Sequence, residues 1–344
     1  MIRTTARAAV RARRTALLAL GAGAALTLSA CGPLPGTDSA ADGTETGKGP
    51  APRGVITQAA AKTVVDTYEK ANNRANTARS EKIEATVEAG QRYEMDRSDY
   101  KLYPTWTAKE KKGFGGSFVY GKRAYYIPRA GTASWFAVTA TASTDHAYDA
   151  LLFFDKVDGA YKLTMSFYTP KKQPLPKIAV DRYGFAQVAD QSRKVGALSP
   201  SELGSVYEDF YESGGTKKAA RAFVANDFTK ESVKVHAERE NGNLKNYVDQ
   251  NFFGKPAAHP AGYALQVAGG GVLAGFPTAH TKEKLLKPKY MSGFDINPSP
   301  EEAVFNPGPH KVMTNEFQGA GLAKMTPNGK PEVVELQYRF TNSH

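Results

Sequence analysis

Residues 151–168 read LLFFDKVDGAYKLTMSFY, two runs of bulky apolar and aromatic residues on either side of an Asp158-Gly159 pair. An Asp-Gly pair between such runs favours a tight turn, because Asp and Gly adopt the required left-handed backbone most easily. The stretch therefore predicts a β-hairpin. An antiparallel sheet is the starting point for the fold.

The segment before this hairpin changes from helical to strand periodicity. Apolar residues recur at helical spacing from Ala61 to Ala75, with charged residues between them, which predicts an amphipathic helix. A second helix is predicted from Ser80 towards Leu102, with Ile83 on its apolar side. Strands are predicted over 117–120, 124–127, 135–141, 151–154 and 161–168, with residues 121–123 turning the first pair.

The second half of the chain repeats this order of elements. Helices are predicted over 203–211, 216–228 and 231–253, and strands over 264–273, 319–325 and 333–340. Proline-rich and glycine-containing breaks at 170–176 and 192–200 place a boundary near residue 195. We therefore predict an α+β fold with two tandem domains, 55–195 and 196–344, each with N-terminal helices packed on a bent antiparallel sheet.

The first 30 residues have the three parts of a secretory signal. Five arginines and no acids precede an apolar run from Thr15 to Leu28, which is too short to span a bilayer as a helix. Leu28, Ser29, Ala30 and Cys31 then resemble the lipobox of bacterial lipoproteins. This resemblance implies that signal peptidase recognises Leu28, Ser29 and Ala30, and that Cys31 carries a diacylglycerol thioether after cleavage of residues 1–30.

The region around the lipobox leaves the export route open and predicts a tether. Arg13 and Arg14 fit twin-arginine export, but Thr15 and Ala16 stand where bulkier apolar residues are usual, which favours general secretion. Residues 31–54 contain Leu34 as their one bulky apolar residue, so we expect a disordered tether behind the lipidated cysteine. The chain has one cysteine, so it forms no internal disulfide.

The charge of the folded part is smaller than that of the whole chain. The full chain carries +11, the signal contributes five arginines, and the tether carries a net −1, so residues 55–344 are near +7. A basic surface suits anionic envelope polymers, anionic lipids or an envelope protein, although ordinary solubility charge explains it equally well. We expect no nucleic-acid partner. The lysines expected to contribute first are Lys111, Lys112, Lys171 and Lys172.

Two resemblances follow from these features. Helices followed by a bent antiparallel sheet resemble the cystatin-like and nuclear-transport-factor-2-like superfold. The arginine-rich start, the alanine-rich apolar run, the lipobox and the Gly/Pro/Thr/Asp tether together resemble secreted actinobacterial lipoproteins of unknown function. This second resemblance implies lipid anchoring on the outer face of the cell membrane. No functional residue of the folded part follows from either resemblance, because no family motif is present there.

The sequence contains no complete catalytic or metal-binding pattern. Ser98 and Lys101 fit S-x-x-K, but the companion elements of serine–lysine enzymes are missing. His259, His280 and His310 fall in one half without metal-site spacing, so no metal and no cofactor is predicted. The tract of glycines at 269–271 is interpreted as a bend in a strand.

Two functions remain open from the sequence. The first is a non-catalytic, surface-tethered binding or scaffold module of the cell envelope. The second is an enzyme with an acid or base group in the concave pocket of one domain. The enzyme hypothesis predicts a titratable group that is buried among aromatic rings and has a shifted pKa.

Overall fold

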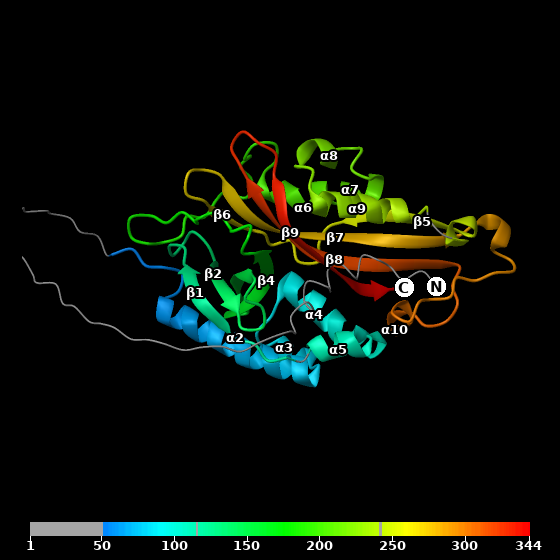
Figure 1. The fold of residues 1–344 in the computed structure, drawn as a ribbon, viewed down its shortest axis with the longest axis horizontal. Coiled ribbons are helices and arrows are strands. Elements are labelled where there is room, and N and C mark those ends of the chain that lie inside the picture. The colour runs from blue at the N-terminus through cyan, green and yellow to red at the C-terminus, as the bar shows by residue number, and fades with distance from the viewer. Residues whose placement is uncertain (1–50, 115, 241–242) are drawn as a thin grey trace, which may run out of the picture.

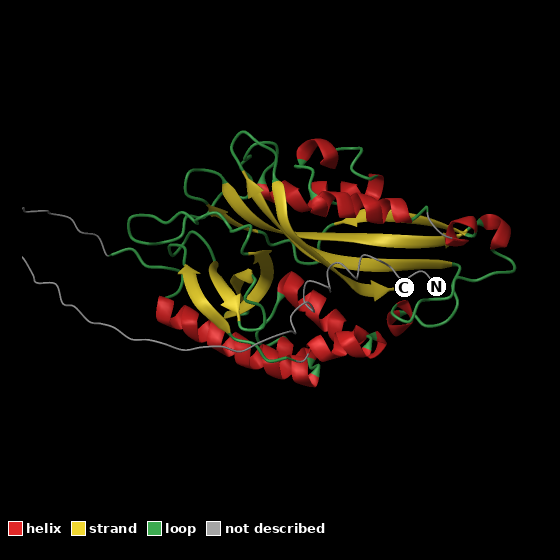
Figure 2. Ribbon diagram, in the orientation of Figure 1, coloured by secondary structure: helices red, strands yellow, loops and turns green. Residues whose placement is uncertain are grey.

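A computed structural model describes residues 51–114, 116–240 and 243–344, and in each half helices precede an antiparallel sheet (Figures 1 and 2). The predicted α+β class is confirmed. The predicted signal peptide, the lipobox residues Leu28 to Cys31 and most of the tether lie outside the described residues. The first half contains α2 (Gln58–Ala78), α3 (Glu81–Glu84), α4 (Gly90–Leu102), η1 (Tyr103–Thr105), α5 (Ala108–Phe114), β1 (Tyr120–Tyr126), β2 (Trp135–Ala142), β3 (Tyr148–Val157) and β4 (Ala160–Pro170).

The second half is built in the same order but with shorter helices and longer strands. Its elements are η2 (Pro200–Glu202), α6 (Leu203–Tyr207), α7 (Asp209–Ser213), α8 (Ala219–Ala222), α9 (Asp227–Glu238), η3 (Asn243–Asn246), β5 (Val248–Lys255), β6 (Tyr263–Gln266), β7 (Val272–Leu286), η4 (Pro288–Tyr290), α10 (Glu302–Phe305), β8 (Val312–Met325) and β9 (Glu332–Ser343).

Each half contributes its own antiparallel sheet. The first has the order β1-β2-β3-β4, and the second has the order β5-β7-β8-β9 with β6 paired to part of β7. The predicted Asp-Gly hairpin joins β3 to β4: Val157 pairs with Ala160, and Asp158 and Gly159 have φ values of 52° and 83°. Both turn residues therefore occupy the left-handed region that the sequence predicted.

The two sheets pack against each other between outer layers of helices, as Figure 1 shows. One core lies between α2 and the outer face of the first sheet, and another lies between the second sheet and α6–α9. The core between the sheets joins residues from both halves, including Phe153 and Phe167 from the first and Leu273 and Leu322 from the second. The halves therefore share a hydrophobic core although their strands do not interleave.

This layering explains why the central strands lack a polar face. In β2, Trp135 and Ala137 point into the core between the sheets, whereas Phe136 and Val138 point towards α2. Successive side chains of a strand face opposite sides, so a strand that is covered on both sides is apolar at nearly every position. The aromatic residues of this region are divided between two cores.

Several predicted elements differ from the structure. The helix predicted over 216–228 is reduced to α8 and the start of α9. Residues 121–123 form a bulge inside the single strand β1, where Lys122 has a φ of 49°, and do not turn a hairpin. The predicted helix over 231–253 ends at Glu238, and β5 follows it, in which burial alternates with a period of two. Glycines 269–271 turn the chain between β6 and β7 with φ values of 85° to 96°, so 264–273 is not one strand.

Candidate functional site

A buried polar cluster lies where α2, α3 and α4 meet, and α3 and α4 fall in the segment from Ser80 to Leu102 that the sequence predicted as one helix. The chain breaks this helix between Glu84 and Gly90, and Gly90 has a φ of 60°. As a result, Glu84 and Glu88 are almost completely buried, whereas Ile83 is only half-buried. The break in the helix places Glu84 and Glu88 inside. The continuous helix that was predicted would instead have placed Ile83 on the buried side.

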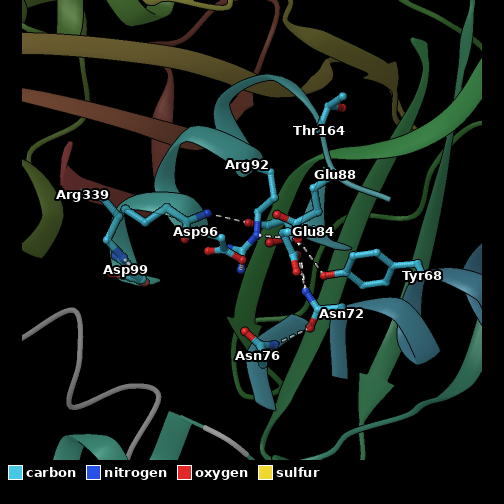
Figure 3. A network of polar contacts seen from close by, with 12 residues as sticks. Tyr68, Asn72, Asn76, Glu84, Glu88, Arg92, Asp96, Asp99, Thr164 and Arg339 are labelled. Atoms are coloured by element: carbon cyan, nitrogen blue, oxygen red, sulfur yellow. Dashed lines mark hydrogen bonds and ion pairs between the residues drawn. The ribbon is translucent and has the colours of Figure 1, made fainter. Parts of the chain in front are cut away.

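Hydrogen bonds from neutral side chains hold the two glutamates in place (Figure 3). Asn72 Nδ2 on α2 donates to Glu84 Oε1 at 2.7 Å, and Tyr100 OH on α4 donates to Glu84 Oε2 at 2.8 Å. Tyr68 OH donates to Glu88 Oε1 at 3.1 Å. The cluster is therefore fixed to both α2 and α4.

Arg92 supplies the positive charge of the cluster. Its Nε lies 3.4 Å from Glu88 Oε1, and its Nη2 donates to Asp96 Oδ2. Oxygens of Glu84, Glu88 and Asp96 lie within 4.8 Å of one another. Three carboxyl groups therefore share one guanidinium in a region with almost no solvent, where isolated charges are costly.

Burial and mutual repulsion shift the protonation of the two glutamates. Burial raises the pKa of Glu88 well above 4.5, and the charges of Asp96 and Glu84 raise it further. Burial also raises the pKa of Glu84, again with a contribution from Asp96. Burial disfavours the charge on Arg92, but Asp96 and Glu88 outweigh it and hold the pKa of the guanidinium well above its ordinary value. Glu88 therefore keeps a proton at pH values where an exposed glutamate has lost it.

The cluster can store a proton, but its oxygens are not open to a substrate. Glu84, Glu88, Arg92 and Asp96 are each at most 5% exposed. Glu88 Oε2, Asp96 Oδ1 and Arg92 Nη1 are buried without a hydrogen-bond partner within the described residues. A divalent cation at these oxygens would have to compete with the Arg92 guanidinium that already contacts Glu88 and Asp96.

Helix α4 also connects this cluster to the second half. Gln91 Nε2 donates to the carbonyls of Gly319 and Thr278 at 2.9 and 3.3 Å. Asp99 Oδ2 accepts from Arg339 Nε on β9 at 2.9 Å, and both side chains are buried. Helix α4 is thus a buried polar joint between the halves.

A second buried polar cluster lies between α7 and the second sheet. Glu208 Oε2 lies 2.9 Å from His280 Nδ1, and Glu208 Oε1 accepts from Tyr338 OH at 2.7 Å. The His280 ring is stacked between Tyr211 and Phe317, with centroid distances of 4.3 and 4.9 Å. A carboxylate that orients a histidine among aromatic rings is typical of acid–base sites, but His280 is only 4% exposed.

Lys282 follows two residues later on the same face of β7. Burial, with a contribution from the charge of Lys284, lowers its pKa to about 8. Its Nζ lies 5.4 Å from the centre of the Phe252 ring, whereas Lys284 forms a close ion pair with Glu302. The positive charge of Lys282 therefore has an aromatic ring nearby, whereas the neighbouring Lys284 has a carboxylate.

The histidines singled out from the sequence do not converge. Each has a different contact. His259 lies 3.4 Å from Glu94, and His310 lies 3.4 Å from the carbonyl oxygen of Asn306, whereas His280 contacts Glu208. The S-x-x-K pattern is also not a working pair. Ser98 is buried and donates to a backbone carbonyl of β9, whereas Lys101 is exposed.

The lysines expected to bind anionic partners lie on different elements. Lys111 and Lys112 are on α5, where Lys111 Nζ donates to the carbonyl of Pro104 at 3.1 Å. Lys171 and Lys172 follow β4, and Lys171 is 3.8 Å from Asp149. Their contribution to binding stays a prediction.

Sequence reasoning missed the glutamate–arginine cluster, although a signal was present. Glu84, Glu88, Arg92 and Asp96 recur at intervals of four residues. Such spacing usually marks ion pairs on the solvated face of a helix, so it points away from a buried site. Only the packing of α2 and the second sheet around α4 reverses that interpretation.

Comparison with known proteins gives the chain a family but no activity. An uncharacterized lipoprotein of Streptomyces coelicolor is 29% identical over 303 residues, which cover 86% of this chain and 83% of the relative. No solved structure matches the chain significantly. Within the described residues, no helix has the length and apolar character needed to cross a bilayer. Residues 52–344, nearly all of the described part, match the family described as a domain of unknown function (DUF8094), and the chain therefore belongs to this family.

Proposed function

We propose that the protein is a lipoprotein that is held on the outer face of the cell membrane by lipid on Cys31. The support is the lipobox at residues 28–31 together with the similarity to a lipoprotein of Streptomyces coelicolor. Two or more acyl chains hold a protein firmly on a bilayer, so the lipid alone is enough for membrane location.

Replacement of the lipidated residue tests the anchor. Cys31→Ala should move the protein from the membrane fraction to the soluble exported fraction, or leave an uncleaved precursor. Thr37→Ala, a change in the tether outside the lipobox, should leave it in the membrane fraction. The anchor is rejected if Cys31→Ala protein still sediments with membranes after a high-salt wash.

We further propose that the folded part is a non-catalytic binding or scaffold module. The observation that carries this proposal is the burial of the two acid–base clusters, because Glu88 and His280 are only 1% and 4% exposed. A general acid or base must come within hydrogen-bond reach of its substrate. The accessible surface, in contrast, offers lysines and aromatic rings.

One observation favours an enzyme as the second candidate. Glu88 has a strongly raised pKa and lies against the Tyr68 hydroxyl, which is the buried titratable group that the enzyme hypothesis requires. This function would need an opening at α3 and α4. Hydrogen exchange tests it: amides of 84–96 that exchange by local opening, far more readily than those of β2 and β3, would support the enzyme, and global protection would oppose it.

We also propose that each half has the cystatin-like and nuclear-transport-factor-2-like superfold. The long helix α2 on the first sheet, and helices α6–α9 on the second, support this arrangement. An experimental structure in which the strand order or the helix position departs from that superfold would reject it.

A further inference from the structure

The end of the second sheet that extends beyond the first half carries an exposed aromatic and basic surface, which we call the distal tip. Figure 1 shows that β7 and β8 extend to this end of the molecule beyond the first half. Four of the ten exposed large apolar residues of the described chain lie there. The distal tip consists of Leu244, Lys245, Tyr247, Lys287, Lys289, Tyr290, Phe294, Lys311 and Val312.

The aromatic residues of the distal tip form one cluster. The ring centre of Tyr290 lies 4.9 Å from that of Tyr247 and 5.4 Å from that of Phe294. Even so, Tyr247 is 40% exposed and Phe294 is 53% exposed. A small core of Val248, Leu286, Ile296 and Met313 lies beneath them and fixes their positions. The rings are thus held together at the surface without being covered.

The four lysines of the distal tip outnumber the two aspartates that lie beside it. Lys287 lies 3.5 Å from Asp249, and Lys311 lies 2.9 Å from Asp295. Lys245 and Lys289 have no carboxylate within 4 Å among the described residues, and Lys289 Nζ lies 4.8 Å from the centre of the Tyr290 ring. Four lysines against two aspartates leave a net charge of +2 beside the exposed rings.

The chemistry of this surface selects an anionic bilayer over a hydrated polymer. Lysines suit the phosphates of either partner. The exposed aliphatic residues Leu244 and Val312 gain nothing from a hydrated polymer, whereas the boundary between headgroups and acyl chains takes up aliphatic and aromatic side chains together. Tyrosine is enriched at that boundary because one end of its ring is apolar and the other is wet.

We propose that the distal tip docks on an anionic membrane surface, with Tyr247 and Phe294 at the acyl boundary and Lys245 and Lys289 against lipid phosphates. This inference rests on the proposed location of the protein at the membrane and deepens its proposed binding role. The N-terminal segment before α2 and the distal tip lie at opposite ends of the molecule in Figure 1, so a docked tip would leave the molecule lying along the bilayer. The lipid keeps the tip close to the bilayer, so weak affinity is sufficient.

Vesicle binding without the lipid anchor tests the distal tip alone. Residues 31–344 with Cys31→Ala are co-sedimented with phosphatidylcholine vesicles that contain about one third phosphatidylglycerol, or none, at low and high salt. We expect binding to the anionic vesicles at low salt. The double change Tyr247→Ser/Phe294→Ser should lower the partition coefficient about tenfold, because affinity follows the apolar area that is buried. Lys245→Gln/Lys289→Gln should lower it similarly and flatten its salt dependence.

Two matched controls separate the tip from general charge and hydrophobicity. Tyr183→Ser removes a 51% exposed ring elsewhere, and Lys70→Gln/Lys230→Gln removes two exposed charges on α2 and α9. The vesicle partition coefficient of each control should stay within about twofold of that of the parent protein. Salt screens exposed charges over a short distance, so charges far from the bilayer contribute little. If a control lowers the partition coefficient as much as the corresponding tip variant does, the proposal is overturned.

A site-specific probe gives a second readout that does not depend on sedimentation. Cys31 is the one cysteine of the chain, so Phe294→Cys in the Cys31→Ala protein accepts a single environment-sensitive fluorophore. Its emission should shift to the blue with anionic vesicles, and a probe at Tyr183→Cys should not. An unshifted probe at residue 294, or binding to purified wall polymers in place of vesicles, would overturn membrane docking. Membrane fractionation of Cys31→Ala is a separate experiment, so failure of the anchor and failure of the tip are distinguishable.

Discussion

At the scale of single residues, the protein places several charges where water cannot reach them. Arg92 is surrounded by Glu84, Glu88 and Asp96, and all four are buried. Burial raises the pKa of Glu88, and the charges of Asp96 and Glu84 raise it further because one guanidinium cannot neutralise three carboxylates. A proton on Glu88 lowers the cost of burial and makes the folded state sensitive to pH.

Glu88→Gln should remove the contribution of Glu88 to this pH sensitivity. A raised folded pKa means that the folded state holds a proton that the unfolded chain releases above about pH 4.5. This contribution to the free energy of unfolding is therefore complete below about pH 4.5 and is lost as pH rises towards the folded pKa. The amide that replaces the carboxyl group keeps an acceptor for Tyr68 and Arg92 without a charge. We expect the substitution to raise the free energy of unfolding at pH 8 by about 1 kcal/mol and to have less effect near pH 4.5.

Denaturant unfolding between pH 4.5 and 8 measures the difference between Glu88→Gln and the unchanged protein. Glu81→Gln, a change at the first residue of α3, is the matched control and should follow the unchanged protein. A loss of more than about 2 kcal/mol for Glu88→Gln at pH 8 would show that Glu88 is needed as a charge.

At the scale of elements, α4 is a helix that is polar on most sides and nevertheless buried. Its buried residues include Gln91, Arg92, Asp96, Ser98 and Asp99, and each has hydrogen-bonding or ionic contacts with another residue. An isolated helix with such a surface would prefer water. Packing between the halves supplies the partners that water would otherwise provide, so the position of α4 is specified by directed polar contacts.

The buried pair of Asp99 and Arg339 should therefore be strongly coupled. Arg339→Met leaves the Asp99 charge buried without this partner, and we expect a loss of about 3 to 5 kcal/mol in the free energy of unfolding. Asp99→Asn in the same chain should restore most of it. A double-mutant cycle by urea unfolding measures the coupling.

A surface pair provides the comparison for this cycle. Lys62 and Asp66 are 2.7 Å apart, with side chains 66% and 33% exposed, and Lys62→Met should cost less than about 1 kcal/mol. Similar costs at the two pairs would mean that α4 is less buried in solution than its contacts indicate.

At the scale of the whole molecule, the two sheets have one core between them. Phe167 and Phe153 lie over Gly275, where an added Cβ would meet Phe167 at 3.0 Å. The connection between the halves is packed as well: Ile178 bridges to Val267, and Val188 bridges to Leu265. The domain boundary near residue 195 and the separate folding of 55–195 and 196–344 stay predictions. The apolar faces that the two halves turn towards each other are complementary.

Co-expression of residues 51–195 and 196–344 as separate chains should therefore give a 1:1 complex. Separation would expose the apolar faces that now form the core between the sheets, at roughly 25 cal/mol per Å². Size-exclusion chromatography detects the complex, and thermal unfolding should show a higher midpoint for the complex than for either piece. Gly275→Leu in the second piece, which would clash with Phe167, should prevent association, whereas Gly293→Leu, at a glycine with nothing within 4 Å of its added Cβ, should not. If the two chains do not associate at micromolar concentration, the shared core is contradicted.

The sequence predicted those features that depend on neighbouring residues. The Asp158-Gly159 turn, the first helix and the α+β order are confirmed, because turn chemistry and apolar periodicity act within a few residues. The same local signals failed where a second layer changed the meaning of the pattern. The segment at 248–253 was predicted as helix, yet it is a strand because β7 pairs with it.

The sequence by itself therefore determined the class of fold, the Asp158-Gly159 turn and, through the lipobox, the proposed anchor. Only the tertiary structure decided that Glu84, Glu88 and Asp96 surround Arg92, that His280 meets Glu208, and that Tyr247, Tyr290 and Phe294 gather at the distal tip. The physical reason is that a charged residue has the same local pattern on a solvated helix as on a buried one. Its environment depends on residues up to 240 positions away, as Asp99 and Arg339 show, and no local rule reaches that distance.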